Sequence, residues 1–464
     1  MELLRALLNL SSYEPEKGDL LKLFQLASND DLSRAEVVTK FESGSHFRQV
    51  NKKLKEKLLD DFLGGSFKGL QPVLQQQFRI RKQALEVILL FQLEKRSVAV
   101  QLAVETLKAA IKYGQLDIAL DLSAKLEHHY SVTELNSAKL KRYRKKHELF
   151  DRLTSEYSEC ERVYNELAVL AQKNKSVVHL ATKIGALGNR VEENDYYKFR
   201  ILFYATKILY AQVRNNADGI VAACKEAIYY LNNTKTVLPR LTQFNFQFQL
   251  IPVYLSQGKY SEAETAITQV LSYPKKGSFN WHHVLLYKAV LGFYSDKPRM
   301  AQSAYWQAQH AQKKFQSPLL EEQWKLVRAY LAWYEKIGRL PDTGQYRLYR
   351  FLNEVTALKS DQLLIIELLH LLIDNKKKKY MERAESILPF IKNNKPSPRT
   401  KHFLKMLLAV EQGDYHEFRV EEHARKHVRA LGRVPIAQTS INVFDAELVR
   451  FELLWDEIVG CLGR

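Results

Sequence analysis

Residues 254–274 read YLSQGKYSEAETAITQVLSYP and contain two apolar helical segments on either side of the polar turn Gly258-Lys259-Tyr260. A glycine at the end of a helix favours the left-handed backbone conformation, which other residues adopt at a higher cost. Pro274 ends the second segment, because proline does not continue a helix. The stretch therefore predicts two antiparallel helices joined by a tight turn, and repetition of this design would predict a stack of helical hairpins.

The same design occurs at two other places in the chain. Each copy has a glycine, a polar residue, an apolar residue that covers the base of the turn and, three positions later, a residue at the crossing of the two helices. These residues are Gly114, Leu116 and Ala119 in the first copy, Gly258, Tyr260 and Ala263 in the second, and Gly413, Tyr415 and Phe418 in the third. Looser copies end at Ala301 and Ala384. Since one hairpin cannot bury both of its apolar faces, the copies predict neighbours on each side and a cap at each end.

The unit that holds the opening stretch resembles the tetratricopeptide repeat, whose period is about 34 residues. The residues at or within one position of the family pattern are Leu250, Tyr254, Gly258, Tyr260, Ala263 and Pro274. Gln247 stands where the family has an early tryptophan, and Ile251 where it has a small residue. The resemblance implies a degenerate, right-handed superhelix of stacked helix pairs whose groove holds a peptide or a partner helix, and it implies no catalysis. The order of elements is also similar to that of large helical-repeat proteins from bacteria, which suggests no activity.

The predicted fold class is all-α, because no segment alternates polar and apolar residues as strands do. Proline is absent from residues 73–238 and recurs after Pro239, which indicates longer helices in the first half and shorter hairpins in the second. The predicted organisation is a helical cap at 1–69, a long-helix region with a coiled-coil-like hairpin at 70–235, and a tetratricopeptide-like region at 236–464.

Residues 135–173 are predicted to form the longest helix. Apolar, aromatic or histidine side chains recur there at steps of three and four, at Leu140, Tyr143, His147, Phe150, Leu153, Tyr157, Cys160, Tyr164, Leu167 and Ala171. Such a stripe is typical of a helix that packs along another helix. The partner is most simply an antiparallel neighbour in the same chain, and dimerisation is the alternative.

The chain carries 70 Lys and Arg residues against 52 Asp and Glu residues, a formal net charge of +18. Such an excess attracts anions, which include nucleic acids, acidic protein surfaces and anionic lipids. The three cysteines have no metal-binding or redox spacing, which suggests a reducing cytoplasm. No signal peptide is expected at the amino terminus, and the apolar run at 363–373 is too short to span a bilayer, so no membrane insertion is expected.

Two basic clusters are the candidate sites for an anionic partner. The first is KLKRYRKKH at 139–147, with Lys139, Lys141, Arg142, Arg144, Lys145 and Lys146, and the second lies in HARKHVRALGR at 423–433, with Arg425, Lys426 and Arg429. Residues 376–379 form a third run of lysines. Contact with phosphates would release counterions from such clusters and relieve their mutual repulsion.

The sequence contains no phosphate-binding loop, dinucleotide-binding motif, serine elbow or zinc-protease motif, so no catalytic residue and no cofactor are predicted. His423 and His427 share a helix face, but the cations between and beside them argue against a metal site. The predicted function is a non-enzymatic cytoplasmic scaffold or adaptor that binds a protein partner through its helical-repeat surface. The alternative is a nucleic-acid-binding or regulatory protein. A peptide-sensing regulator is a third hypothesis, although no helix-turn-helix domain is evident.

Overall fold

The computed structural model describes residues 13–28, 32–61, 70–173, 175–191, 193–194, 196–234, 241–311, 318–341, 361–436 and 447–462, and the single positions 4, 8, 64 and 238. Within these ranges the chain is all-α and contains no strand. The sequence contains a glycine-rich segment at 64–69, and of it only Gly64 lies within the described residues. The chain divides into two compact units. Unit 1 comprises Met1–Asn165, Thr182–Phe203 and Thr234–Pro239, and unit 2 comprises Glu166–Ala181, Tyr204–Asn233 and Arg240–Arg464.

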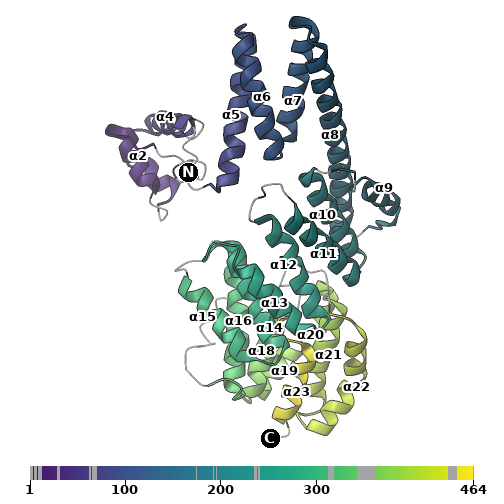
Figure 1. Cartoon of the computed structure of the whole chain (residues 1–464). Coiled ribbons are helices and arrows are strands. Elements are labelled where there is room, and N and C mark those ends of the chain that lie inside the picture. The colour runs from purple at the N-terminus through teal and green to yellow at the C-terminus, as the bar shows by residue number, and fades with distance from the viewer. Residues whose placement is uncertain are drawn as a thin grey trace. The chain divides into compact units, whose positions relative to one another are not determined.

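Unit 1 contains two groups of helices, each with its own apolar core (Figure 1). The first group is α2 (Gly18–Ser28), α3 (Arg34–Val38) and α4 (Gly44–Asp61). The second group is α5 (Pro72–Gln92), α6 (Arg96–Lys112), α7 (Leu116–His128), the π-helix η2 (His129–Thr133) and α8 (Ser137–Gln172), which extends into unit 2. The short helices η3 (Val178–Leu180), which belongs to unit 2, and α9 (Ala181–Val191), which lies in unit 1 from Thr182 onward, follow.

The long helix predicted at 135–173 is confirmed, because α8 runs from Ser137 to Gln172. Part of its apolar stripe is buried, because Tyr143, Phe150 and Leu153 belong to the core that α8 shares with α5, α6 and α7. Glu127, at the end of α7, accepts hydrogen bonds from Arg144 Nε at 2.9 Å and His147 Nδ1 at 2.8 Å. The first half of α8 therefore packs on α7, its antiparallel neighbour in the same chain.

Unit 2 is a succession of helices, and from residue 244 onward they share one continuous apolar core. The chain enters it through α10 (Tyr197–Val213), which begins in unit 1, and continues through α11 (Ala217–Asn233), α12 (Leu241–Ser256), α13 (Tyr260–Leu271), α14 (Phe279–Tyr294), α15 (Pro298–Ala311), α16 (Pro318–Lys336), α18 (Asp361–Ile373), α19 (Lys377–Ala384), α20 (Ile387–Asn394), α21 (Pro398–Gln412), α22 (Glu417–Arg433) and α23 (Phe451–Leu462). Consecutive helices pack on one another as hairpins. No helix in the described part of the chain has the length and apolarity that crossing a membrane requires.

One turn recurs between the paired helices. A residue with positive φ ends the first helix, and the N–H of the next residue donates to the carbonyl five positions earlier, at 2.7–3.1 Å. This is the hydrogen bond of the Schellman motif. The left-handed residues are Glu94 and Gly114 in unit 1, and Asn215, Gly258, Asp296, Gly338, Asn375 and Asp414 in unit 2. In unit 2 they are 43, 38, 42, 37 and 39 residues apart, so the hairpins repeat about every 40 residues.

The third copy of the predicted turn differs from the prediction. Gly413 has φ −86°, and the left-handed residues are instead Asp414 and Tyr415. Phe418, expected at the helix crossing, is exposed, and Val420 is buried in its place. Glycine at position 413 allows the chain to pass close to α22, because a Cβ there would lie 2.7 Å from the backbone nitrogen of Val420. The extra left-handed residue lengthens the turn and shifts the buried position along the chain.

The glycines and alanines predicted at the other turns have the backbone conformation and the burial that the hairpin design requires. Gly114 and Gly258 both have positive φ, of 62° and 70°. Their partners at the helix crossing, Ala119 and Ala263, are buried, and so is Ala301. A Cβ added to Gly292 would lie 2.6 Å from the backbone nitrogen of Ala301, which shows how closely α14 and α15 approach.

Polar contacts join consecutive hairpins of unit 2. Gln212 donates to Gln249 at 2.9 Å, Arg339 pairs with Asp296, and Lys336 pairs with Asp374, and the partners are 37, 43 and 38 residues apart. Each exposed pair contributes only about 0–1 kcal/mol to stability. These contacts join residues about one repeat apart, so each of these hairpins lies beside the next one along the chain.

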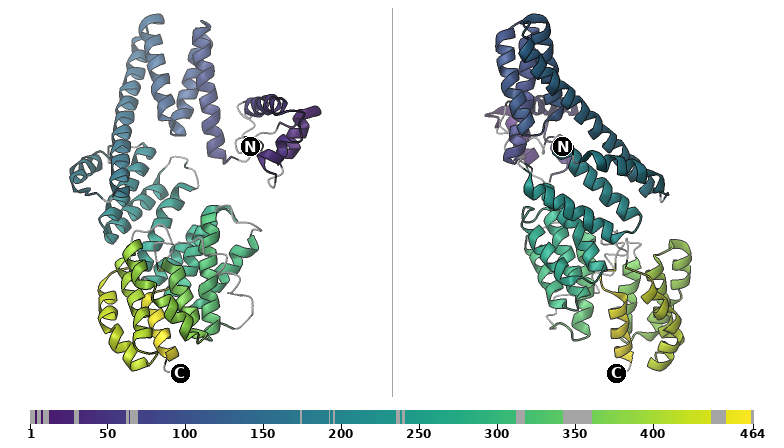
Figure 2. Two further views of the ribbon diagram at one scale, coloured as in Figure 1. Left: turned by 180° about the vertical axis from the view of Figure 1, so that it is seen from behind. Right: turned by 45° about the vertical axis from the view of Figure 1, so that its right-hand side comes forward.

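The C-terminal segment folds back onto the earlier hairpins. Tyr294 of α14 donates its hydroxyl to the carbonyl of Glu447 at 2.7 Å, and the ring of Phe451 stacks on Phe403 of α21 with a centroid distance of 4.4 Å. Arg339, after α16, lies 3.5 Å from Glu457. Figure 2 (right) shows α23, in yellow, beside the yellow-green helices α20–α22. The parts of α14 and α21 that meet this C-terminal segment are therefore already covered by the chain itself.

Candidate functional site

The basic cluster at 139–147 occupies the first turns of α8, and two of its cations are paired with acids from outside the run. Lys139 Nζ lies 3.0 Å from Glu134 Oε1 and 4.8 Å from the centroid of the Tyr130 ring. Arg144 Nε lies 2.9 Å from Glu127 Oε1. These two charges are partly neutralised within unit 1.

The remaining cations of this cluster lack such partners. Among the described residues, no carboxylate pairs with Lys141, Arg142 or Lys145, and all three side chains are exposed. Burial lowers the pKa of the half-buried Lys146, and the charges of Arg142 and of Lys108, on α6, lower it further. The α8 cation patch, defined as Lys141, Arg142, Lys145 and Lys146 with Lys108, is thus a surface of uncompensated positive charge.

The second cluster lies on α22 of unit 2, so the two predicted clusters belong to different compact units. Arg425, Lys426 and Arg429 are exposed, while Val420, Ala424 and Leu431 form the buried face of that helix. The nearest imidazole contact of His427 is to His402 of α21, with 3.2 Å between the two Nδ1 atoms. Burial and the charge of Lys405 lower the pKa of both histidines.

An apolar stripe on α5 was not anticipated from the sequence. Ile80, Ala84 and Val87 form the buried face of this helix. At 100° per residue, Leu85 and Leu89 lie on the opposite face, and they are 57% and 48% exposed. Leu93, at the end of the helix, is 67% exposed and extends the stripe. The α5 stripe, defined as Leu85, Leu89 and Leu93, is therefore an apolar surface on a helix that is already packed on its other side.

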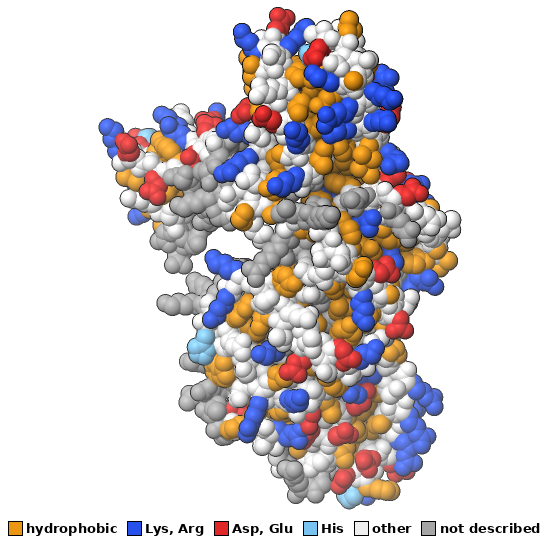
Figure 3. All heavy atoms as spheres, viewed as in Figure 1, with side chains coloured by type: hydrophobic (Ala, Val, Ile, Leu, Met, Phe, Trp, Pro, Cys, Tyr) orange, Lys and Arg blue, Asp and Glu red, His pale blue; other side chains and the backbone are white. Residues whose placement is uncertain are grey.

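Cationic side chains accompany apolar surface in this part of unit 1. Lys82 lies one turn before Leu85 on the same side of α5, and Lys95 and Arg96 follow Leu93. Figure 3 shows orange apolar side chains among blue Lys and Arg side chains over α6, α7 and α8. Contiguous exposed apolar surface with a charged rim is typical of a protein-interaction site.

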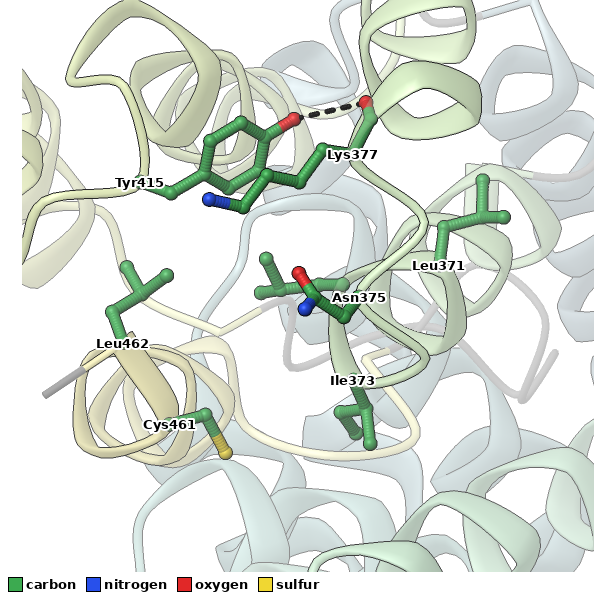
Figure 4. A pocket seen from close by; sticks show the side chains of 8 residues that line it. Leu371, Ile373, Asn375, Lys377, Tyr415, Cys461 and Leu462 are labelled. Atoms are coloured by element: carbon green, nitrogen blue, oxygen red, sulfur yellow. Dashed lines mark hydrogen bonds between the residues drawn. The ribbon is translucent and has the colours of Figure 1, made fainter. Parts of the chain in front are cut away.

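Unit 2 contains a pocket of about 370 Å³ where four segments meet. Its lining residues are Leu371, Leu372, Ile373, Asn375, Lys377, Tyr415, Cys461 and Leu462. Figure 4 shows Cys461 and Leu462 of α23 on one side, Leu371, Ile373 and Asn375 on the other, and Lys377 and Tyr415 above them. The hydroxyl of Tyr415 donates to the carbonyl of Lys377 at 3.1 Å, and Lys377 Nζ lies 4.8 Å from the centroid of the Tyr415 ring.

A buried ion cluster fixes the start of the C-terminal segment. Arg399 of α21 donates to both Glu447 and Glu452, with Nη2 3.1 Å from Glu447 Oε2 and 2.8 Å from Glu452 Oε1. It also donates to the carbonyls of Leu431 and Val434. With its donors used in this way, the guanidinium has a structural role.

In the described ranges, no group of three or more His, Cys, Asp or Glu side chains is arranged to hold a metal ion. Comparison of the chain with known protein families, curated proteins and solved structures finds no match. The candidate surfaces are therefore the α8 cation patch, the α22 cluster, the α5 stripe and the pocket beside α23.

Proposed function

We propose that this chain is a non-enzymatic adaptor of the cytoplasm that binds a protein partner through an exposed surface of its helical hairpins. The observation that carries the proposal is the α5 stripe, because an amphipathic helix normally exposes its polar face. The hairpins support a degenerate, tetratricopeptide-like solenoid, although their period of about 40 residues is longer than the about 34 residues of that family.

The chemistry of the α5 stripe indicates what the partner presents. Three leucines at intervals of four residues match the apolar face of a helix laid along α5. Lys82, Lys95 and Arg96 would face the rim of that helix, so acidic side chains there would be favoured. The expected partner segment is therefore an amphipathic helix with acidic flanks.

Changing both Leu85 and Leu89 to aspartate should abolish capture of the partner while leaving the fold intact. Both side chains are largely exposed, so the stability change should come mainly from the lower helix propensity of aspartate and stay within about 1 kcal/mol. The measurement is affinity capture with the full-length chain, followed by quantification of the partner that the wild type retains in stoichiometric amount. Leu388→Asp in unit 2 is the matched control, because Leu388 is 55% exposed and should be neutral.

Equal capture by the wild type and the double variant would refute the assignment of the α5 stripe. Failure to capture any stoichiometric protein under several conditions would refute the adaptor function itself. Light scattering of the isolated chain gives a further check, because a dimer that the double variant converts to a monomer would show that the stripe binds a second copy instead.

A nucleic-acid-binding function is the second candidate, and the α8 cation patch favours it. If it holds, changing Lys141, Arg142 and Lys145 to glutamate should weaken binding to RNA or DNA. The slope of log K against log salt should fall by about 0.7–0.9 for each phosphate that the variant no longer neutralises. Lys139→Gln and Arg144→Gln are matched controls with smaller expected effects, because these cations are already paired. Absence of any mobility shift at low salt would exclude this function.

A further inference from the structure

We propose that the pocket beside α23 is a binding site for an alkyl carboxylate, a small anion with an apolar chain. Its volume of about 370 Å³ lies in the range of small-molecule sites. Leu371, Leu372, Ile373 and Leu462 supply aliphatic walls on which an alkyl chain can pack. This site is independent of the α5 stripe, which lies in unit 1, and does not depend on the adaptor function.

Lys377 provides the charge that selects an anion. The nearby carboxylate of Asp374 is already paired with Lys376 at 2.9 Å and with Lys336. Glu411 and Asp414 act on the Tyr415 phenol, whose pKa is raised first by burial and then by these two charges, but neither pairs with Lys377 in the described part of the chain. A carboxylate placed at the pocket would therefore gain a charge-assisted hydrogen bond from an ammonium that pairs with no carboxylate of the described residues.

The polar lining of the pocket is held by unusual backbone geometry. Asn375 and Tyr415 both have positive φ, of 52° and 59°. Asparagine tolerates this conformation, whereas a bulky residue such as tyrosine adopts it rarely. Asn375 is the left-handed residue of the turn that recurs between the helix pairs, whereas Tyr415 is an additional left-handed residue in its turn. Strained backbone at a bulky residue is concentrated at ligand and active sites. Here it places the Tyr415 ring beside Lys377 and directs the ammonium to the edge of the apolar walls.

Cys461 allows occupancy of the pocket to be measured without a label. It is half-buried in the wall formed by α23, whereas Cys160 and Cys224 are completely buried. A neutral maleimide should thus react at Cys461 first, and a ligand in the pocket should cover that thiol. Mass spectrometry of the labelled chain identifies the modified residue.

The experiment measures the rate of maleimide labelling at Cys461 in the full chain as n-decanoate is added below its micellar concentration. At four times the dissociation constant, mass action predicts a rate about fivefold lower. n-Decanol has the same chain without the charge and should need a concentration about tenfold higher. Lys377→Gln should raise the dissociation constant for decanoate about tenfold and leave that for decanol unchanged. Lys378→Gln, an exposed neighbour outside the lining, should behave as the wild type.

Isothermal titration calorimetry with decanoate gives the stoichiometry independently of thiol reactivity, and one molecule per chain is expected. Equal affinities for decanoate and decanol, or an unchanged affinity for decanoate in Lys377→Gln, would overturn the assignment of an anion site. Absence of saturable binding in calorimetry would overturn the site altogether. None of these outcomes bears on partner capture by the α5 stripe, so the two proposals fail separately.

Discussion

Replacing Arg399 with methionine should lower the free energy of unfolding of unit 2 by about 3–5 kcal/mol. The side chains of Arg399 and Glu447 are both only 6% exposed. Without the guanidinium, Glu447 becomes an uncompensated buried carboxylate, and the carbonyls of Leu431 and Val434 lose a donor. The measurement is urea unfolding followed by tryptophan fluorescence, which reports on unit 2 because all five tryptophans lie in it.

Two further variants separate this effect from the loss of an ordinary ion pair. Arg383→Met removes the ion pair between Arg383, whose side chain is 42% exposed, and Glu367, whose side chain is 34% exposed. This change should lower the free energy of unfolding by about 1 kcal/mol or less. Adding Glu447→Gln to Arg399→Met should recover part of the loss, because the buried charge is then gone. A cost for Arg399→Met no greater than that for Arg383→Met would contradict the role assigned to the buried cluster.

The pH dependence of Arg399→Met follows from the environment of Glu447. Burial raises the pKa of Glu447 even though Arg399 lowers it through a hydrogen bond and its charge. Loss of the guanidinium should raise this pKa further. A carboxyl whose folded-state pKa is raised binds its proton more tightly in the native state, so its contribution to stability is present at low pH and lost as pH rises through that pKa. The destabilisation by Arg399→Met should therefore shrink as pH falls.

The buried cluster also explains why an acidic segment lies on a strongly basic chain. Glu447, Glu452 and Glu457 recur at intervals of five residues and reach Arg399 and Arg339 on the earlier hairpins. The apolar residues Phe451 and Trp455 between them are buried. The stacked hairpins thus receive α23 as a helix of complementary charge with one apolar face. This face of the hairpins is consequently covered by the chain itself. Under the proposed adaptor function, a partner would bind another surface, such as the α5 stripe.

The repeat design could be predicted from sequence where glycine marks the turn, as at Gly114 and Gly258. It was missed at Glu94 and Asn215, because these residues adopt the left-handed conformation without any compositional signal as strong as glycine. The backbone hydrogen bonds of the turn form whatever side chain is present, so the tertiary stack, more than local preference, decides where the helix stops.

A candidate site could be predicted from the sequence where all of its residues lie on one helix. Helical periodicity placed the cations of α8 on its surface, but the acids that neutralise Lys139 and Arg144 lie before that run in the chain. The α5 stripe has a visible pattern, since apolar residues occur on both faces of the helix. Periodicity does not show which face is covered, however. The pocket combines four separate segments, and no local pattern joins Lys377 to Cys461.

Replacing His370 with leucine should remove a large part of the acid sensitivity of unit 2. His370 of α18 is buried, and its Nε2 lies 3.2 Å from the carbonyl oxygen of Ala329. Burial, with a smaller effect of the Lys336 charge, lowers its pKa from 6.5 to about 4. The unfolded chain therefore binds a proton that the native state does not bind between these two pH values.

The sign and size of the effect follow from this difference in proton binding. The native state keeps His370 neutral, so its stability is complete above pH 6.5 and is lost as pH falls toward 4, by about 3 kcal/mol in total. In His370→Leu this loss should disappear. On acidification from pH 7.5 to pH 4, the free energy of unfolding of the variant should therefore rise relative to that of the wild type by up to this amount. The measurement is the same fluorescence-detected urea unfolding at several pH values. Parallel pH profiles for the two proteins would show that the buried imidazole is not the group responsible.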